Sequence, residues 1–165
     1  FAFNSAVLDG AAGGQVVAPL LTALMSEPYL RMAPPKSTGR DLFNAPWLAS
    51  HLAACSDMAP RDVQATLLEF TTLVCAADVR RHALDCTSLL VCGGGALNTA
   101  LMQRLQSALP NVAVSSTAQQ GLPPLQVEAT AFAWLARKAV HRESASLESV
   151  TGTQGARVLG AIYPR

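Results

Sequence analysis

The sequence predicts a single domain of the α/β class. In the second half of the chain, helical patterns alternate with two short apolar strands, and this order is typical of an α/β unit. With 165 residues, 50% of them hydrophobic, the chain is long enough to bury a core without disulfides or metals. Only 14% of the residues are charged, against about 25% in typical domains. This apolar excess indicates that a partner normally covers part of the surface.

Three helices are predicted in the first half. Apolar residues at helical spacing predict a helix over Gln15 to Met25, which ends before Pro28. A short helix is expected over Pro46 to Ala54, with Asn44 as its N-cap. A long helix is expected over Pro60 to Leu84. Its apolar face is so broad that it indicates burial on more than one side. That face is formed by Val63, Leu67, Leu68, Phe70, Leu73, Val74, Cys75 and Ala77.

The second half continues as strand, helix, strand and helix. The strands are expected at Leu89 to Cys92 and Val112 to Val114, with a helix over Asn98 to Leu109 between them. A last helix is expected over Pro124 to His141, and the tail Arg157 to Tyr163 is typical of a strand or extended segment packed on the body. The inner stripe of the last helix is expected to consist of Leu125, Ala129, Phe132, Ala136 and Val140.

Three consecutive glycines mark the junction between the first strand and the helix that follows it. Gly93, Gly94 and Gly95 lack a Cβ, so the backbone can bend sharply and a ligand can approach it closely. Unpaired N–H groups and the positive end of the next helix favour a phosphate or a polar sugar edge. We therefore predict a nucleotide site at these glycines and Asn98, with the glycine amides facing open space. A tight turn without a ligand is the simpler alternative.

The details of this junction exclude two common nucleotide motifs. A dinucleotide fingerprint needs a third glycine where Asn98 stands, and an acidic residue where Ser115 and Ser116 follow the second strand. A Walker loop needs Lys followed by Ser or Thr after the glycines, and neither is present. The remaining familiar user of this pattern is the adenosine loop of the superfamily of sugar kinases, actin and heat-shock chaperones.

Two further places carry candidate functional residues. Lys36 and Arg40 lie close together in the polar segment Arg31 to Asn44, where they are candidates for an anion or domain-interface contact. A surface connector with solvated charges is the simpler interpretation of that segment. Glu128 lies near the first turn of the last helix, where a carboxylate complements the helix dipole.

Composition argues against several function classes. A net charge of +1 without a basic cluster argues against nucleic acid as the main partner. No apolar run approaches the 18 or so residues that span a membrane, and no signal peptide is visible. The missing initiator Met suggests that the chain begins inside a longer protein. The four cysteines show no C-x-x-C spacing and the histidines do not cluster with them, so we expect no metal site and buried, reduced thiols. These residues are Cys55, Cys75, Cys86, Cys92, His51, His82 and His141.

Five blocks, in order along the chain, resemble the C-terminal part of the anhydro-N-acetylmuramic acid kinase family. They are Pro34 to Asn44 (PPKSTGRDLFN), Val91 to Asn98 (VCGGGALN), Glu128 to Ala136 (EATAFAWLA), Ser149 to Gly152 (SVTG) and Val158 to Pro164 (VLGAIYP). The resemblance implies a ribonuclease H-like fold of the actin and sugar kinase type. By this resemblance residues 1–165 form one C-terminal, nucleotide-binding portion of the second domain, with several helices around a small mixed sheet. The N-terminal domain and the upstream strands are then absent.

The resemblance also implies an activity. The family uses ATP and Mg²⁺ to convert 1,6-anhydro-N-acetylmuramic acid into N-acetylmuramic acid 6-phosphate, opening the anhydro ring with water, in bacterial cytoplasmic cell-wall recycling. Glu128 matches the family's Glu near the sugar and the attacking water. The general-base Asp and the first phosphate loop of the family lie upstream and are absent here. We therefore expect the isolated chain to be inactive; a non-catalytic nucleotide-binding or interaction module is the alternative. Families of this kind commonly form homodimers.

Overall fold

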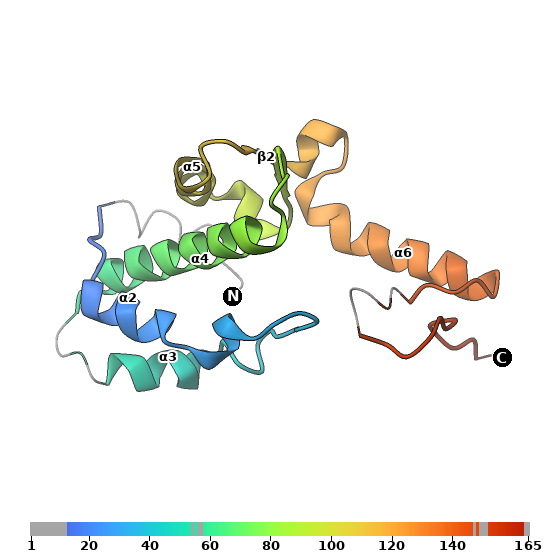
Figure 1. Ribbon diagram of the computed structural model, residues 1–165, viewed down its shortest axis with the longest axis horizontal. Coiled ribbons are helices and arrows are strands. Elements are labelled where there is room, and N and C mark those ends of the chain that lie inside the picture. The colour runs from blue at the N-terminus through green and yellow to red at the C-terminus, as the bar shows by residue number, and fades with distance from the viewer. Residues whose placement is uncertain (1–12, 54, 56–57, 147, 149–151, 164–165) are drawn as a thin grey trace.

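The computed structural model describes residues 13–53, 55, 58–146, 148 and 152–163, which form helices and a small parallel sheet (Figure 1). The helices are α2 (Ala18–Met25), α3 (Ala45–Leu52), α4 (Pro60–His82), α5 (Thr99–Ala108) and α6 (Val127–Val140), and the strands are β1 (Ser88–Val91) and β2 (Ala113–Ser116). Four short 3₁₀ helices complete the order: η1 (Pro28–Arg31), η2 (Gly94–Leu97), η3 (Thr117–Gln120) and η4 (Pro124–Gln126). The predicted α/β class is confirmed.

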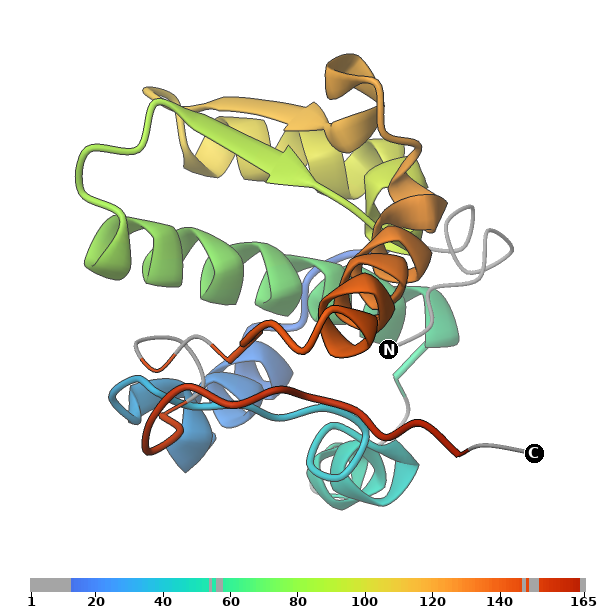
Figure 2. The same cartoon turned by 90° about the vertical axis from the view of Figure 1, so that its right-hand side faces the viewer.

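Helix α4 is the central element, and both of its sides are buried, as its broad apolar face predicts. On one side Leu67 and Phe70 pack with Leu20 and Leu24 of α2. On the other side Leu68 packs with α5 and the sheet. Figures 1 and 2 accordingly show α4 between a layer of α2 and α3 and a layer of α5 with the two strands. The glycine loop therefore belongs to the layer of α5 and the two strands, which packs on α4.

Helix α2 begins three residues later than the sequence pattern predicts. The backbone N–H of Gln15 donates to Oδ1 of Asp62 over 2.8 Å, and the N–H of Val17 donates to Oγ1 of Thr66 over 2.9 Å. These bonds hold residues 15–17 against α4 before the helix starts, and Pro19 occupies its first turn. Tertiary contacts therefore override the helical periodicity here.

The cap predicted for the short helix is confirmed. Oδ1 of Asn44 accepts from the N–H of Trp47 over 2.9 Å, and α3 begins at Ala45. The helix ends at Leu52, and its predicted end at Ala54 lies outside the described residues.

The sheet consists of β1 and β2 in parallel, with Ser88 opposite Ala113 and Val91 opposite Ser116. The expectation of a mixed sheet is therefore wrong for the described residues. The connection from β1 through α5 to β2 explains why: a helical crossover returns the chain in the same direction. Both strands are shifted by one or two residues from their predicted limits. Val91 and Val114 pack on the α4–α5 core, while Leu90, on the opposite face, is 43% exposed.

Helix α6 differs most from expectation, because its predicted inner stripe is exposed. Leu125 is 65%, Phe132 64% and Val140 66% exposed, and Ala129 and Ala136 are exposed as well. Figure 1 shows α6 extending away from the layers around α4. None of its described residues is buried. The periodicity identifies an apolar face correctly, but the described chain supplies little to cover that face.

The tail lies alongside α6 rather than on the body, and its residues 157–163 form no strand. The backbone N–H of Ala145 donates to the carbonyl of Arg157, and a Cβ at Gly160 would lie 3.4 Å from the Cβ of Ala139. Ile162 is 69% and Tyr163 89% exposed. Helix α6 and the tail thus form one unit with much apolar surface, which we call the α6–tail surface (residues 125–140 and 157–163).

The expectation that the thiols are buried is wrong for two of them. Cys75 and Cys92 are exposed, Cys55 and Cys86 are half-buried, and all four are unpaired thiols. Helix α4 buries the sides facing α2 and α5, and Cys75 lies outside these two faces. In the part of the chain that the structure describes, no helix is both long and apolar enough to cross a membrane.

Candidate functional site

The glycine loop has a backbone that only glycine adopts readily. Gly93 has φ 71° and ψ −168°, a region essentially closed to residues with a Cβ. Gly95 is constrained differently, because a Cβ there would approach Cδ2 of Leu101 to 3.3 Å. The first glycine therefore makes the turn out of β1, and the third lets η2 pack closely on α5.

The three glycine amides are not equivalent. The N–H of Gly93 donates to the carbonyl of Pro124 over 2.8 Å, so the expectation of an open amide is wrong for this residue. Gly94 and Gly95 begin η2, where the leading N–H groups have no partner within the helix. Within the described chain neither of these two amides donates a hydrogen bond. Two adjacent donors at a strand-to-helix junction are therefore available to a ligand.

Asn98 has a structural role at this junction. Its side chain is buried, with 4% exposure, and its Oδ1 accepts from the backbone N–H of Leu101 over 3.0 Å. It thereby caps α5. A direct contact of Asn98 with a nucleotide stays a prediction; what the structure adds is that this residue fixes the start of the helix behind the glycines.

Pro124 joins the glycine loop to the helix that carries Glu128. Its carbonyl holds Gly93, and η4 runs directly into α6. Glu128 lies in the first turn of α6 with an exposed side chain, and no described residue forms an ion pair with it. The two predicted parts of the site are thus linked through one backbone hydrogen bond. The sequence pattern marks Pro124 only as a helix start and does not reveal this link.

Lys36 and Arg40 have different surroundings. Nζ of Lys36 lies 3.9 Å from Oδ2 of Asp78 and 5.0 Å from the centre of the Tyr29 ring, and its side chain is only 10% exposed. Arg40 is exposed, and no described carboxylate pairs with it. Lys36 therefore fastens the polar segment to α4. The anion role predicted for Lys36 and Arg40 stays untested, and the partner Asp78 could not be found by spacing along the sequence.

Over the described ranges, no three side chains among His, Cys, Asp and Glu gather into a group that could hold a metal ion. The candidate site combines the unpaired amides of Gly94 and Gly95 with the exposed carboxylate of Glu128 on α6. Unpaired backbone amides can donate to phosphate or sugar oxygens, and an exposed carboxylate can accept a proton or orient a water molecule.

Comparison with known proteins identifies the family. The family model described as anhydro-N-acetylmuramic acid kinase matches residues 6–165. The anhydro-N-acetylmuramic acid kinase of Variovorax paradoxus strain S110 is 60% identical over 154 residues, which are 93% of this chain and 41% of that protein. The enzymes of that name from Albidiferax ferrireducens and Burkholderia ambifaria are 58% and 55% identical, over 94% of this chain.

The chain spans about two fifths of the length of these relatives, 41% or 42% in each case. The match of the family model nevertheless covers nearly all of the chain, including the glycine loop and α6. The chain therefore belongs to the anhydro-N-acetylmuramic acid kinase family.

Proposed function

We propose that this chain is the nucleotide-binding C-terminal part of a ribonuclease H-like carbohydrate kinase. The complete enzyme would use ATP and Mg²⁺ to open and phosphorylate 1,6-anhydro-N-acetylmuramic acid, giving N-acetylmuramic acid 6-phosphate in the peptidoglycan recycling of the bacterial cytoplasm. A homodimer is the assembly we propose for it. The open amides of Gly94 and Gly95 are the observation that carries the proposal.

In this proposal the glycine loop binds and orients the nucleotide. The amides of Gly94 and Gly95 donate to its polar oxygens, and the positive end of α5 lies behind them. Asn98 keeps that end in place by capping α5. The N–H of Gly93 donates a hydrogen bond to the carbonyl of Pro124. The segment that leads into α6 therefore helps to position the loop.

Glu128 is proposed to act on the sugar side of the reaction. Its exposed carboxylate accepts a hydrogen bond from the attacking water or from a sugar hydroxyl, and so aims the oxygen that opens the anhydro ring. Bound ATP supplies the phosphoryl group that is transferred. Among the described residues no three His, Cys, Asp or Glu side chains gather into a group that would hold Mg²⁺.

The proposal is tested in the complete enzyme with a coupled assay for turnover of the anhydro sugar. Glu128→Gln preserves the size of the side chain and removes its charge. We expect kcat to fall by about a hundredfold, in line with the usual contribution of a positioned acid or base, while ATP affinity stays within about twofold. Glu148→Gln, a charge-matched change outside the proposed site, should leave kcat unchanged.

Three results would count against this assignment. An unchanged kcat in Glu128→Gln would show that the Glu128 carboxylate takes no part in the reaction. ATP binding without any turnover in the complete protein would favour the non-catalytic nucleotide-binding module instead. Turnover by the purified 165-residue chain alone would show that the upstream general base and phosphate loop are not needed.

A further inference from the structure

The outer edge of β2 is covered by the side chain of a residue of α5, Gln106. The backbone N–H of Ala113 donates to the carbonyl of Thr87 over 2.9 Å, so this residue of β2 directs its backbone groups towards β1. Successive residues of a strand direct these groups to alternate sides, so the N–H of Val114 and the carbonyl of Val112 point to the opposite edge. No described strand lies along that edge.

The carboxamide of Gln106 binds both of these backbone groups. Its Oε1 accepts from the N–H of Val114 over 3.0 Å, and its Nε2 donates to the carbonyl of Val112 over 3.0 Å. Nε2 also donates to the carbonyl of Leu109, just after α5, over 3.2 Å. A neighbouring strand would offer an N–H and a C=O to the same two groups, and a primary amide carries the same donor and acceptor. Gln106 therefore occupies the position of a third strand.

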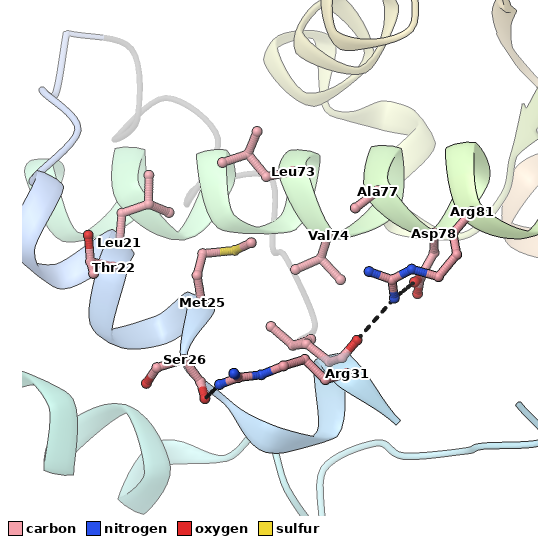
Figure 3. Close-up of a pocket in the computed structure, with 11 residues that line it drawn as sticks. Leu21, Thr22, Met25, Ser26, Arg31, Leu73, Val74, Ala77, Asp78 and Arg81 are labelled. Atoms are coloured by element: carbon pink, nitrogen blue, oxygen red, sulfur yellow. Dashed lines mark hydrogen bonds and ion pairs between the residues drawn. The ribbon is translucent and has the colours of Figure 1, made fainter. Parts of the chain in front are cut away.

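The contact at Arg31 is of a simpler kind. Nη2 of Arg31 donates to the carbonyl of Ser26, just after α2, over 2.9 Å (Figure 3). Gln106 differs because it binds a donor and an acceptor two residues apart on one strand edge. Its side chain is exposed, so the edge that it covers lies at the surface, where another protein chain can reach it.

We propose that Gln106 prevents a second copy of this chain from pairing with β2. An uncovered strand edge offers a row of free N–H and C=O groups to another chain. Every copy carries the same edge, so two uncovered β2 edges can pair antiparallel about a two-fold axis. The carboxamide occupies groups that such a pair needs. This role involves neither the glycine loop nor Glu128, so it holds independently of the proposed kinase reaction.

Sedimentation velocity of the complete protein tests this proposal, with the wild-type assembly as the baseline. Gln106→Met keeps the length of the side chain and removes its hydrogen bonds to β2. We expect this variant to associate beyond the wild-type assembly, at a concentration about tenfold lower than the wild type needs. Gln103→Met is the matched control and should sediment as wild type. Gln103 also lies on α5, is exposed and forms none of the described side-chain hydrogen bonds.

A second variant separates protection of the edge from stability. Gln106→Glu loses the donor to Val112 but places a charge at the edge, and charges on edge strands oppose pairing. It should therefore sediment as wild type, although it weakens the same contact.

Hydrogen exchange gives an independent measurement at concentrations too low for association. The Val114 amide should exchange about tenfold faster in Gln106→Met than in the wild type, because the acceptor Oε1 is gone. If Gln106→Met fails to fold by circular dichroism, Gln106→Asn replaces it, since its carboxamide is one methylene shorter and does not span the gap to β2.

Three results would overturn the proposal. Unchanged sedimentation of Gln106→Met would show that the β2 edge needs no protection. Equal association of Gln106→Met and Gln106→Glu would assign the effect to lost stability and not to an uncovered edge. An unchanged exchange rate of the Val114 amide in Gln106→Met would show that the carboxamide does not protect this edge.

Discussion

At the scale of single residues, Gly93 shows how a backbone conformation shapes the candidate site. Its φ and ψ lie in a region where other residues are strained, and no neighbouring atom lies within 4 Å of a Cβ placed there. The requirement for glycine is therefore conformational and not steric. The turn it makes gives its own amide to Pro124 and leaves the next two amides open.

Gly93→Ala should lower the free energy of unfolding by about 1–3 kcal/mol, the usual cost of forcing a residue with a Cβ into this region. ATP affinity should fall as well, because the loop must relax to relieve the strain. Urea denaturation and a nucleotide titration measure the two effects. Gly39→Ala is the control: Gly39 has no positive φ, and a Cβ there meets only Oδ1 of Asp41 at an ordinary 3.6 Å. Equal stability of the two variants would refute the assignment of strain to Gly93.

At the scale of elements, the sequence pattern predicts what is local. It locates α4, α5 and the glycine junction because apolar periodicity and turn residues act over a few positions. It also identifies Asn44 as an N-cap, because a cap depends on one hydrogen bond between a side chain and the backbone a few residues later. It misplaces the start of α2, because Asp62 and Thr66 hold the preceding residues from 47 and 49 positions away along the chain.

The candidate site likewise has local features that the sequence pattern predicts and long-range contacts that it does not. The glycines are visible as a motif, whereas the bond from Gly93 to Pro124 joins residues 31 positions apart and has no local pattern. Lys36 is likewise recognisable as a charge, but its partner Asp78 lies on a different element. Long-range pairings of this kind depend on the packing of α4 and cannot be predicted from spacing.

The support that α4 gives to α5 is testable at one residue. Leu68 is buried against Leu101 and Leu105, so Leu68→Ala should lower the free energy of unfolding by about 2–5 kcal/mol. Nucleotide affinity should fall in parallel, because α5 carries the end of the glycine loop. Leu84→Ala is the matched control, since Leu84 follows the same helix and is 84% exposed. Loss of less than about 0.5 kcal/mol in Leu68→Ala, the level of a surface change, would contradict this role of α4.

At the scale of the whole molecule, the apolar composition and the α6–tail surface have a common explanation. Leu125, Phe132, Trp134, Ile162 and Tyr163 are each between 47% and 89% exposed, and all belong to this surface. Exposed apolar surface of this extent is unusual for a protein without a partner. Neither described core cluster around α4 includes a residue of α6, so the apolar face of this helix is free to contact a partner.

We expect the 165-residue chain to self-associate through the α6–tail surface. Burying even a few hundred Å² of apolar area gains several kcal/mol, at about 25 cal/mol per Å², which offsets much of the cost of association. Sedimentation velocity should show a mass that rises with concentration. The double variant Phe132→Ser, Ile162→Ser should shift the association to at least tenfold higher concentration, and it should leave the core unaffected because both side chains are exposed. Leu84→Ser, at an even more exposed apolar position outside this surface, should not change the association. A monomer at every concentration, with a cooperative thermal transition and no binding of a hydrophobic dye, would show that the α6–tail surface needs no partner.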